Sequence, residues 1–366
     1  MAGSVFQVGE QRIRPGVYVR VTDVGEPPEA IVPQGTVATL FRASWGPLGE
    51  VVTMESAEAI PAIFGSGGTT DVIKENFRGG CRRVLGFRLG SGGEKAIISL
   101  QDGAAVDVVK LEALYEGVRG NDFSVTVRDS LADETKRELL IYEKTTLRQT
   151  VEFAKGTAEP QSLVDAIKES NSPWVTATKI DDGSGALAET AQSPFTGGKD
   201  PTVTGEDYSA GLLAIEAIDW NVLCVDTDDA ITHVVVQTYI DRVRNEGKRV
   251  IGVVGEPTSV EMATRFANSR AFNDPAIVYV ANGFKGSDGI TREGYLAAAR
   301  VAGMIAGSQI TDSLTHAVVR GATEIAGALT NAEIEQAILS GALVFTMSAQ
   351  KQVHIEYGTN TFITVT

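Results

Sequence analysis

The sequence is poor in the residues from which most active sites and metal centres are built. It contains two cysteines and three histidines in 366 residues. Cys81 and Cys224 lie too far apart in the chain to form a metal-binding pair by local spacing, and they supply no disulfide framework, which fits a reducing compartment. His233, His316 and His354 have no cysteine or histidine partner at ligand spacing. We therefore expect structural roles for the histidines.

Long hydrophobic runs and excess positive charge are also missing. The N-terminal residues lack an apolar core behind a basic start, so we expect no signal peptide. The most apolar stretch, Tyr295–Gly307, is short and contains Arg300, so it is not expected to span a bilayer. The chain has 47 acidic and 32 basic residues, and its net charge of −15 disfavours binding to nucleic acid or to an anionic membrane. We expect a folded protein in a cytoplasm-like solvent, without a cofactor.

The common catalytic motifs are absent as well. The sequence has no Walker A motif, no G-x-G-x-x-G, no G-x-S-x-G and no H-E-x-x-H. The glycine clusters at 65–68 and 90–93 are interpreted as turns. Cys224 lies in the apolar run Val222–Val225 and is expected to be a buried small hydrophobe. Cys81 is followed by two arginines that could lower its pKa, but no base is indicated nearby.

The best catalytic candidate is an acidic cluster formed by Asp226, Asp228 and Asp229. It follows the predicted strand Val222–Val225, at the edge where open α/β sheets bind ligands. Three carboxylates could hold Mg²⁺ beside a phosphate substrate. The alternative, which we favour, is that Asp228 or Asp229 caps the next helix, because aspartate is common at that position and no lysine or arginine lies in the cluster.

The predicted elements divide the chain into four parts. Residues 1–35 are expected to form an extended arm, and residues 36–93 the first part of an α/β core. Residues 94–205 show short alternating strands separated by Gly, Asp and Asn, which indicate a small antiparallel β domain with one helix, Gln161–Glu169. The stretch Asp181–Thr204 is rich in Gly, Ser, Thr and Asp and is expected to be a mobile loop. Residues 206–366 are expected to complete the core.

Individual elements of the core can be predicted from their patterns. The strands are expected at Thr36–Phe41, Arg83–Leu89, Val222–Val225, Arg249–Val254 and Ala276–Val280, and the helices at Ala57–Phe64 (with Ser56 as its cap), Asp71–Arg78, Tyr208–Ile218, Ile231–Glu246 and Arg292–Gly307. Their alternation in the second half predicts a mostly parallel sheet covered by helices. Capping boxes are predicted at Thr258–Glu261 and Thr330–Glu333. A hairpin of Leu343–Ser348 with Gln352–Tyr357 and a last strand, Thr361–Thr366, complete the prediction.

Several short motifs occur in an order that is specific when they are taken together. They are Arg14-Pro15-Gly16-Val17-Tyr18-Val19 in the arm, Arg119-Gly120-Asn121-Asp122 and Phe195-Thr196-Gly197-Gly198 in the β domain, Ala302-Gly303, Ala306-Gly307 and Ser313-Leu314-Thr315 in the second half, and Gly358-Thr359-Asn360-Thr361-Phe362 near the end. In this arrangement the whole chain resembles the tail sheath protein of contractile-tailed phages, prophages and phage-tail-like bacteriocins.

The resemblance implies a fold and a function. The fold would be α/β, or α+β multidomain, with a discontinuous α/β core domain and an inserted, outward-facing antiparallel β domain. The protein would be a virion structural subunit, not an enzyme, assembled in the bacterial host cytoplasm into stacked hexameric rings around an inner tail tube. Its partners would be neighbouring sheath subunits, the tube protein, and baseplate and tail-terminator proteins, with no nucleic acid and no membrane.

The resemblance also implies linking arms that add strands to the sheets of neighbouring subunits. The candidate residues for the linking arm are Val5, Phe6, Val8, Val17, Tyr18 and Val19. Members of the family continue into a C-terminal helical segment and arm, which we expect to be missing after Thr366.

Two other classes of function stay open at this point. A metal-dependent phosphotransfer or hydrolase domain would use Asp226, Asp228 and Asp229. A binding module would hold a host or sugar ligand in residues 94–205.

Overall fold

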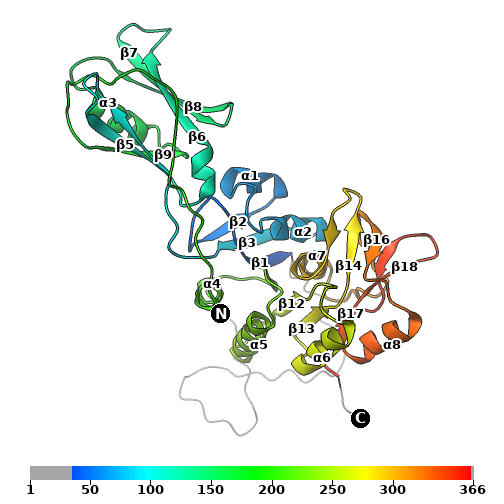
Figure 1. Ribbon diagram of the computed structural model, residues 1–366. Helices are drawn as coiled ribbons and strands as arrows, with labels where there is room; N and C mark the ends of the chain where they lie inside the picture. The colour runs from blue at the N-terminus through cyan, green and yellow to red at the C-terminus, as the bar shows by residue number, and fades with distance from the viewer. Residues whose placement is uncertain (1–34, 364–366) are drawn as a thin grey trace, which may run out of the picture.

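A computed structural model of the protein describes residues 35–363. Figure 1 shows a larger body, made of segments from both halves of the chain, and a smaller body that protrudes from it. The larger body is built around one mostly parallel sheet, and the smaller one consists of antiparallel strands and one helix within residues 97–194. The predicted fold class, a discontinuous α/β core with an inserted antiparallel β domain, is confirmed.

A seven-stranded sheet forms the centre of the core domain. In chain order its strands are β1 (Thr36–Phe41), β2 (Val51–Met54), β3 (Arg83–Arg88), β11 (Val222–Val225), β12 (Ile251–Gly255), β13 (Ile277–Val280) and β17 (Ala342–Leu343). The spatial order is β17-β13-β12-β11-β1-β3-β2, and only β2 runs antiparallel to its neighbour. Because β1 lies between β3 and β11, segments from the two halves of the chain share one sheet.

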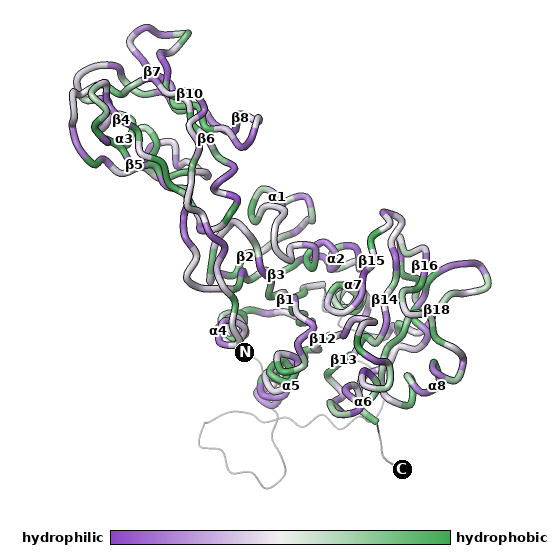
Figure 2. The backbone as a smooth tube through the Cα atoms, in the orientation of Figure 1, coloured by the Kyte–Doolittle hydropathy of each residue, from purple (hydrophilic) through white to green (hydrophobic). Residues whose placement is uncertain are grey.

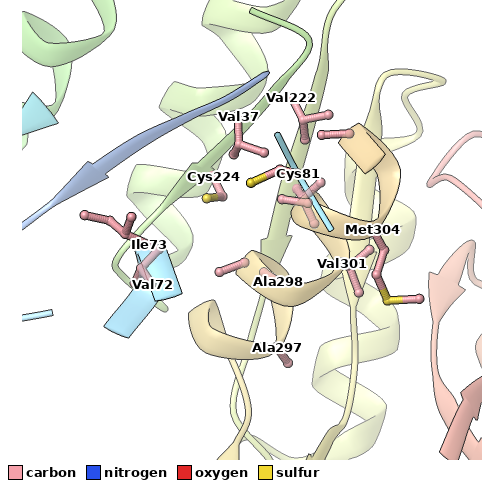
Figure 3. Close-up of a cluster of buried hydrophobic side chains, with 14 of the residues drawn as sticks. Val37, Val72, Ile73, Cys81, Val222, Cys224, Ala297, Ala298, Val301 and Met304 are labelled. Carbon is pink, nitrogen blue, oxygen red and sulfur yellow. The ribbon is translucent and has the colours of Figure 1, made fainter. Parts of the chain in front are cut away.

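Helices cover both faces of this sheet, which is why its central strands are mostly apolar. One face carries α2 (Asp71–Gly79) and α7 (Tyr295–Gly307), and the other carries α4 (Gly205–Ala214), α5 (Ala230–Asn245) and α6 (Met262–Phe272). Successive residues of β1 point to opposite faces. Val37 packs in the cluster beneath α7, as Figure 3 shows, whereas Ala38 packs in the cluster beneath α4 and α5. Within residues 35–363 no helix has the length and hydropathy needed to cross a bilayer.

The alanine- and glycine-rich composition of α7 allows it to lie against α2 at very short range. A Cβ atom on Gly303 would overlap the carbonyl oxygen of Asn76 in α2, and one on Gly79 would overlap the backbone of α7. Small side chains at such a crossing let two helix backbones approach more closely than larger residues permit. The glycines therefore set the spacing of this helix layer.

The inserted domain packs two antiparallel sheets around one core. Its elements are β4 (Ile97–Gln101), β5 (Asp107–Ala113), the 3₁₀ turn η2 (Val118–Asp122), β6 (Phe123–Asp129), β7 (Lys136–Glu143), β8 (Thr146–Ala154), α3 (Glu159–Glu169), β9 (Val175–Lys179) and β10 (Thr190–Pro194). The sheet orders are β10-β6-β7-β8 and β4-β5-β9. Buried and partly exposed residues alternate along β6, and Figure 2 shows hydrophobic and hydrophilic residues mixed throughout this body.

Smaller elements complete the core domain. They are η1 (Ala57–Ala59), α1 (Ile60–Ile63), β14 (Gly283–Gly286), β15 (Thr291–Arg292), β16 (Ala322–Ala326), α8 (Asn331–Leu339), β18 (Phe345–Met347) and β19 (Val353–Ile355). The predicted capping box of Thr330 with Glu333 opens α8, and the predicted hairpin is formed by β18 and β19. Both predictions are confirmed.

One predicted loop was wrong. The stretch Asp181–Thr204 is not a mobile loop, because it is paired along much of its length. Part of it forms β10, which lies against β6. Isolated bridges join the rest to earlier segments, at Asp102 with Leu187, Ile97 with Thr196, Glu94 with Lys199 and Ser91 with Thr202. Its polar composition reflects an exposed edge of the inserted domain, and backbone pairing partners cannot be read from composition.

Three local predictions also need correction. Thr258 does not form a capping box with Glu261, because its hydroxyl and amide donate to the carboxylate of Glu293. Ser56 stands before η1 but makes no side-chain cap. The described part of the predicted last strand, residues 361–363, is not in a strand, and Thr361 instead exchanges hydrogen bonds with the backbone of Asp274. For Thr258 and Thr361 a partner distant in sequence replaces the local one.

Candidate functional site

The carboxyl edge of the parallel sheet holds the acidic cluster that we considered for catalysis. Asp226, which follows β11, is fully buried. One of its carboxylate oxygens accepts hydrogen bonds from the amide and Nε of Arg42, at 2.9 and 2.8 Å, and from the hydroxyl of Thr69. The other accepts from the Tyr208 hydroxyl at 2.6 Å. Burial and the neighbouring Asp226 raise the pKa of Tyr208, which therefore remains a proton donor to this carboxylate.

The other two aspartates bind helix N-termini. Asp229 accepts hydrogen bonds from the amide and hydroxyl of Thr232, both at 2.8 Å, so it caps α5 as predicted, and the Thr232 amide lowers the pKa of Asp229. Asp228 instead accepts from the Tyr295 amide at 2.6 Å, at the first turn of α7. Burial, together with Glu293 and Glu256, raises the pKa of Asp228 to about 6.

The three aspartates therefore hold the core together and do not converge on a common point. Asp226 joins β1, β11 and α4, whereas Asp228 and Asp229 stabilise the N-termini of two different helices. Among residues 35–363 there is no group of three or more His, Cys, Asp and Glu side chains arranged to hold a metal ion. The geometry of the cluster is accounted for by protein partners.

The cysteines and His233 are buried in the core. Burial raises the pKa of Cys81 to about 12 and that of Cys224 to about 11, so the lowered pKa considered for Cys81 is wrong. Burial also lowers the pKa of His233, whose Nε2 lies 2.9 Å from the Thr227 carbonyl oxygen and therefore donates to it. These three side chains are inaccessible to a substrate, because each has a relative exposure of 7% or less.

His316 and His354, which are distant in sequence, are neighbours in the structure. Their ring centroids are 5.5 Å apart, and the backbone of residues 316–319 pairs with β19. The Nε2 atom of His354 lies 3.1 Å from the Thr346 hydroxyl. The two histidines are neighbours because of the register in which a loop pairs with the hairpin, so no sequence spacing could have revealed their proximity.

The candidate residues of the linking arm cannot be placed. Val5, Phe6, Val8, Val17, Tyr18 and Val19 lie outside the described residues. The described chain begins with Gly35, just before β1.

The junction between the core and the inserted domain is a buried polar site that sequence reasoning missed. The guanidinium group of Arg88, at the end of β3, is fully buried. It donates to the carbonyl oxygens of Ala43, Gly46 and Glu116, at 3.0, 2.6 and 2.8 Å. The first two acceptors belong to the core and the third to the inserted domain, so one side chain joins both. Burial lowers the pKa of Arg88 to about 10.

Trp45 makes the apolar half of this junction. It belongs to the loop after β1, yet its 1%-exposed side chain packs in the core of the inserted domain. Its ring forms edge-to-face contacts with Tyr115 and Phe123, at centroid distances of 5.2 and 5.1 Å, and the Arg119 guanidinium lies over it at 5.6 Å. The hydrophobic core of the inserted domain is therefore completed by a residue of the core domain.

The motifs at 119–122 and 195–198 meet at the same place. Asn121 donates to the Gly198 carbonyl oxygen at 2.9 Å and accepts from the Gly198 amide at 2.8 Å. Arg119 donates to the Pro61 carbonyl oxygen of the core domain at 3.1 Å and pairs with Glu143 of the inserted domain at 2.7 Å. The two connecting segments also pair with each other, through the Ser91–Thr202 and Glu94–Lys199 bridges. These contacts fix the orientation of the inserted domain.

A buried ion network stabilises the helix layer nearby. Glu75 of α2 is 1% exposed, and its two carboxylate oxygens pair with Arg292 and Arg300, which are also buried. Asp288 extends the network at 2.6 Å from Arg292, and its hydrogen bond raises the pKa of Arg292 further. Burial lowers the pKa of Arg300. These ion pairs connect α2 with α7 and β15.

Comparisons with known proteins agree with this architecture. Residues 202–361 match the phage tail sheath protein central domain, and residues 91–200 match the phage tail sheath protein beta-sandwich domain. The whole chain is 28% identical to the uncharacterized protein YqbK and 24% identical to the phage-like element PBSX protein XkdK, both of Bacillus subtilis, and it spans 76% of each. A sheath tail protein of Desulfitobacterium hafniense matches 96% of the chain, over 76% of its own length, with 26% identity and a TM-score of 0.76.

The two matched domains together account for most of the chain, and the structure and the relatives lead to the same assignment. The chain belongs to the family of phage tail sheath proteins, which are structural proteins and not enzymes.

Proposed function

We propose that this chain is a subunit of a contractile tail sheath. Such a sheath would surround an inner tail tube as stacked hexameric rings and contract to drive the tube through the host envelope. The observation that carries the proposal is the junction at Arg88 and Trp45, which joins the two sheath domains into one rigid unit.

A contracting sheath requires subunits that are rigid within themselves. The polymer shortens only if interfaces between subunits change from one packing to another while each subunit keeps its shape. A fully buried guanidinium bound to three carbonyl oxygens of two domains is costly to break, because the charge would lose its partners in a desolvated site. Movement is therefore directed to the contacts between subunits.

Contacts between moving subunits also need tethers. We infer that the residues before Gly35 supply them by adding strands to sheets of neighbouring subunits, with Val5, Phe6, Val8, Val17, Tyr18 and Val19 as the linking residues. Edge strands such as β2, β8 and β18 terminate their sheets and offer backbone groups to an added strand. Backbone pairing tolerates a change of angle between subunits better than a packed interface does.

The proposed partners follow from this role. They are neighbouring copies of the chain, the inner tube protein, and the baseplate and tail-terminator proteins at the two ends. The net charge of −15 opposes association with nucleic acid and keeps single subunits apart until assembly begins. The proposed place of the protein is the tail of the virion, with assembly in the bacterial host cytoplasm.

The test is made in the strain that carries the gene, with particles examined by negative-stain electron microscopy after induction. Deletion of the gene is expected to give tails with a bare tube. The double variant Val17→Asp/Val19→Asp, which puts charges on the linking arm, is expected to give bare or partly covered tubes. Leu131→Asp is the control, because Leu131 is 84% exposed on the inserted domain, and its tails are expected to be sheathed.

Two results would count against the proposal in different ways. Sheathed, contracting tails from the deletion strain would exclude the sheath function. Normal sheaths from the Val17→Asp/Val19→Asp variant would leave the function in place and remove these residues from the linking arm.

A further inference from the structure

A hollow of about 600 Å³ opens at the amino edge of the central sheet. Its volume lies within the range of roughly 300–1,000 Å³ that is usual for binding sites. The floor includes Val222 and Ile251, where β11 and β12 begin, and the wall comes from the segment after α7 and from residues 357–360. The acidic cluster lies at the opposite edge of the sheet, after β11 ends.

The described chain begins at the rim of this hollow. The amides of Gly35 and Thr36 both donate to the Asn221 side-chain oxygen at 3.2 Å, and Asn221 lines the hollow. The position follows from the topology, because β1 runs parallel to β11 and parallel strands begin at the same edge. Gly35 therefore stands at the opening of the hollow.

The surface of the hollow combines apolar and polar side chains, and its charged residues are Arg244, Arg249 and Asp312. Ile251, Ile305 and Leu314 are only partly buried, and Ile310 is 70% exposed. Partly exposed apolar side chains gathered in one hollow are typical of a docking site. Arg249, which is exposed, also lines the hollow, although the chain as a whole carries a charge of −15.

We propose that residues 26–33 of the same chain dock in this hollow. Their sequence, Glu-Pro-Pro-Glu-Ala-Ile-Val-Pro, combines an apolar pair, Ile31 and Val32, with two carboxylates, Glu26 and Glu29. The apolar pair matches the floor and wall, and the carboxylates match Arg249. The prolines favour an extended backbone, and at roughly 3.3 Å per residue the chain from Gly35 back to Glu26 can span about 30 Å.

This docking would determine where the linking arm leaves the subunit, since only residues 1–25 would remain available to a neighbour. The inference does not depend on the sheath function, because it concerns contacts within one chain. It uses the position of Gly35, the shape of the hollow and the charge of the docked residues.

The test is hydrogen–deuterium exchange of the full chain, read by mass spectrometry in peptides that cover residues 305–314 and 357–360. Ile31→Asp/Val32→Asp is expected to remove protection from these peptides and to leave peptides of β11 to β13 unchanged. The matched control, Val5→Asp/Val8→Asp, carries the same two charges further along the arm and is expected to retain the protection. Equal exchange in wild type and in Ile31→Asp/Val32→Asp would overturn the proposal.

Reversal of the charges on both sides of the proposed contact tests it independently. Arg249→Glu is expected to lose part of the protection, and addition of Glu26→Lys/Glu29→Lys is expected to restore it. If the added lysines did not restore the protection, Arg249 would not pair with Glu26 and Glu29. The protection is expected to be unchanged on about tenfold dilution, and a loss on dilution would overturn docking within one chain and assign the hollow to a second copy.

Discussion

Replacement of Trp45 by alanine tests whether the inserted domain depends on the core domain for its stability. The Trp45 side chain is 1% exposed and fills the space between Tyr115, Phe123 and Arg119 of the inserted domain. Truncation of a buried tryptophan to alanine costs about 3–5 kcal/mol of unfolding free energy, because the transfer energy is lost and a cavity remains. The loss should fall on the inserted domain, although the substituted residue belongs to the core sequence.

Two tryptophans allow the domains to be followed separately in urea. Trp174 packs against the core of the inserted domain, and Trp220 belongs to the cluster beneath α4 and α5. Trp45→Ala is therefore measured in a Trp220→Phe background and in a Trp174→Phe background. With a urea dependence of roughly 1–3 kcal/mol per M for a domain of this size, the midpoint reported by Trp174 should fall by about 1–5 M. The midpoint reported by Trp220 should change much less.

The result that would refute the reasoning is an equal shift of both midpoints, or no shift of either. An equal shift would mean that the two domains unfold as one unit, and no shift would mean that Trp45 contributes little to the packing. Leu131→Ala serves as the control, because Leu131 is 84% exposed and a surface substitution of this kind changes stability by about 0.5 kcal/mol or less.

Three further predictions concern the core domain. Gly303→Val should destabilise the protein by about 3 kcal/mol or more, since the valine side chain would overlap α2. Thermal unfolding checks this, with Gly205→Ala as the control, because a side chain at Gly205 would enter open space. Asp228→Asn should stabilise the protein by about 1–2 kcal/mol above pH 7, after allowance for partial exposure. The amide oxygen of the new side chain can still accept the hydrogen bond from the Tyr295 amide, whereas the raised pKa of about 6 means that the wild type loses stability as the pH rises through 6. The difference from wild type should vanish below about pH 4, and a pH-independent difference in urea titrations would contradict it. Glu75→Gln should cost about 3–5 kcal/mol, because two buried arginines lose their carboxylate, whereas Lys74→Gln should be nearly neutral; equal midpoints for both variants would exclude a stabilising network.

Local patterns in the sequence were sufficient for most of the core elements. The runs at Thr36–Phe41 and Val222–Val225 became β1 and β11 with the predicted bounds, because a strand buried on both faces must be mostly apolar. The capping box at Thr330 was also correct. Such features depend on residues within a few positions of one another, so they can be read without knowledge of the fold.

The partners of polar side chains could not be read in this way. Thr258 has a glutamate at the spacing of a capping box, yet it binds Glu293, which a neighbouring loop brings closer. The same holds for Asp228, which stabilises α7 and not the helix that follows it in sequence. Hydrogen bonds are satisfied by whichever group the fold places within about 3 Å, and sequence spacing limits that choice only inside one element.

The sequence by itself determined the alternation of strands and helices, the position of the inserted domain and the likeness to tail sheath proteins, because each depends on periodicity or on the order of motifs along the chain. Only the tertiary structure decided that Arg88 and Trp45 join the two domains. It also placed Gly35 at the rim of a hollow lined by residues from distant parts of the chain. These sites consist of contacts between segments that are far apart in sequence, and such contacts come into existence only when the sheet has assembled.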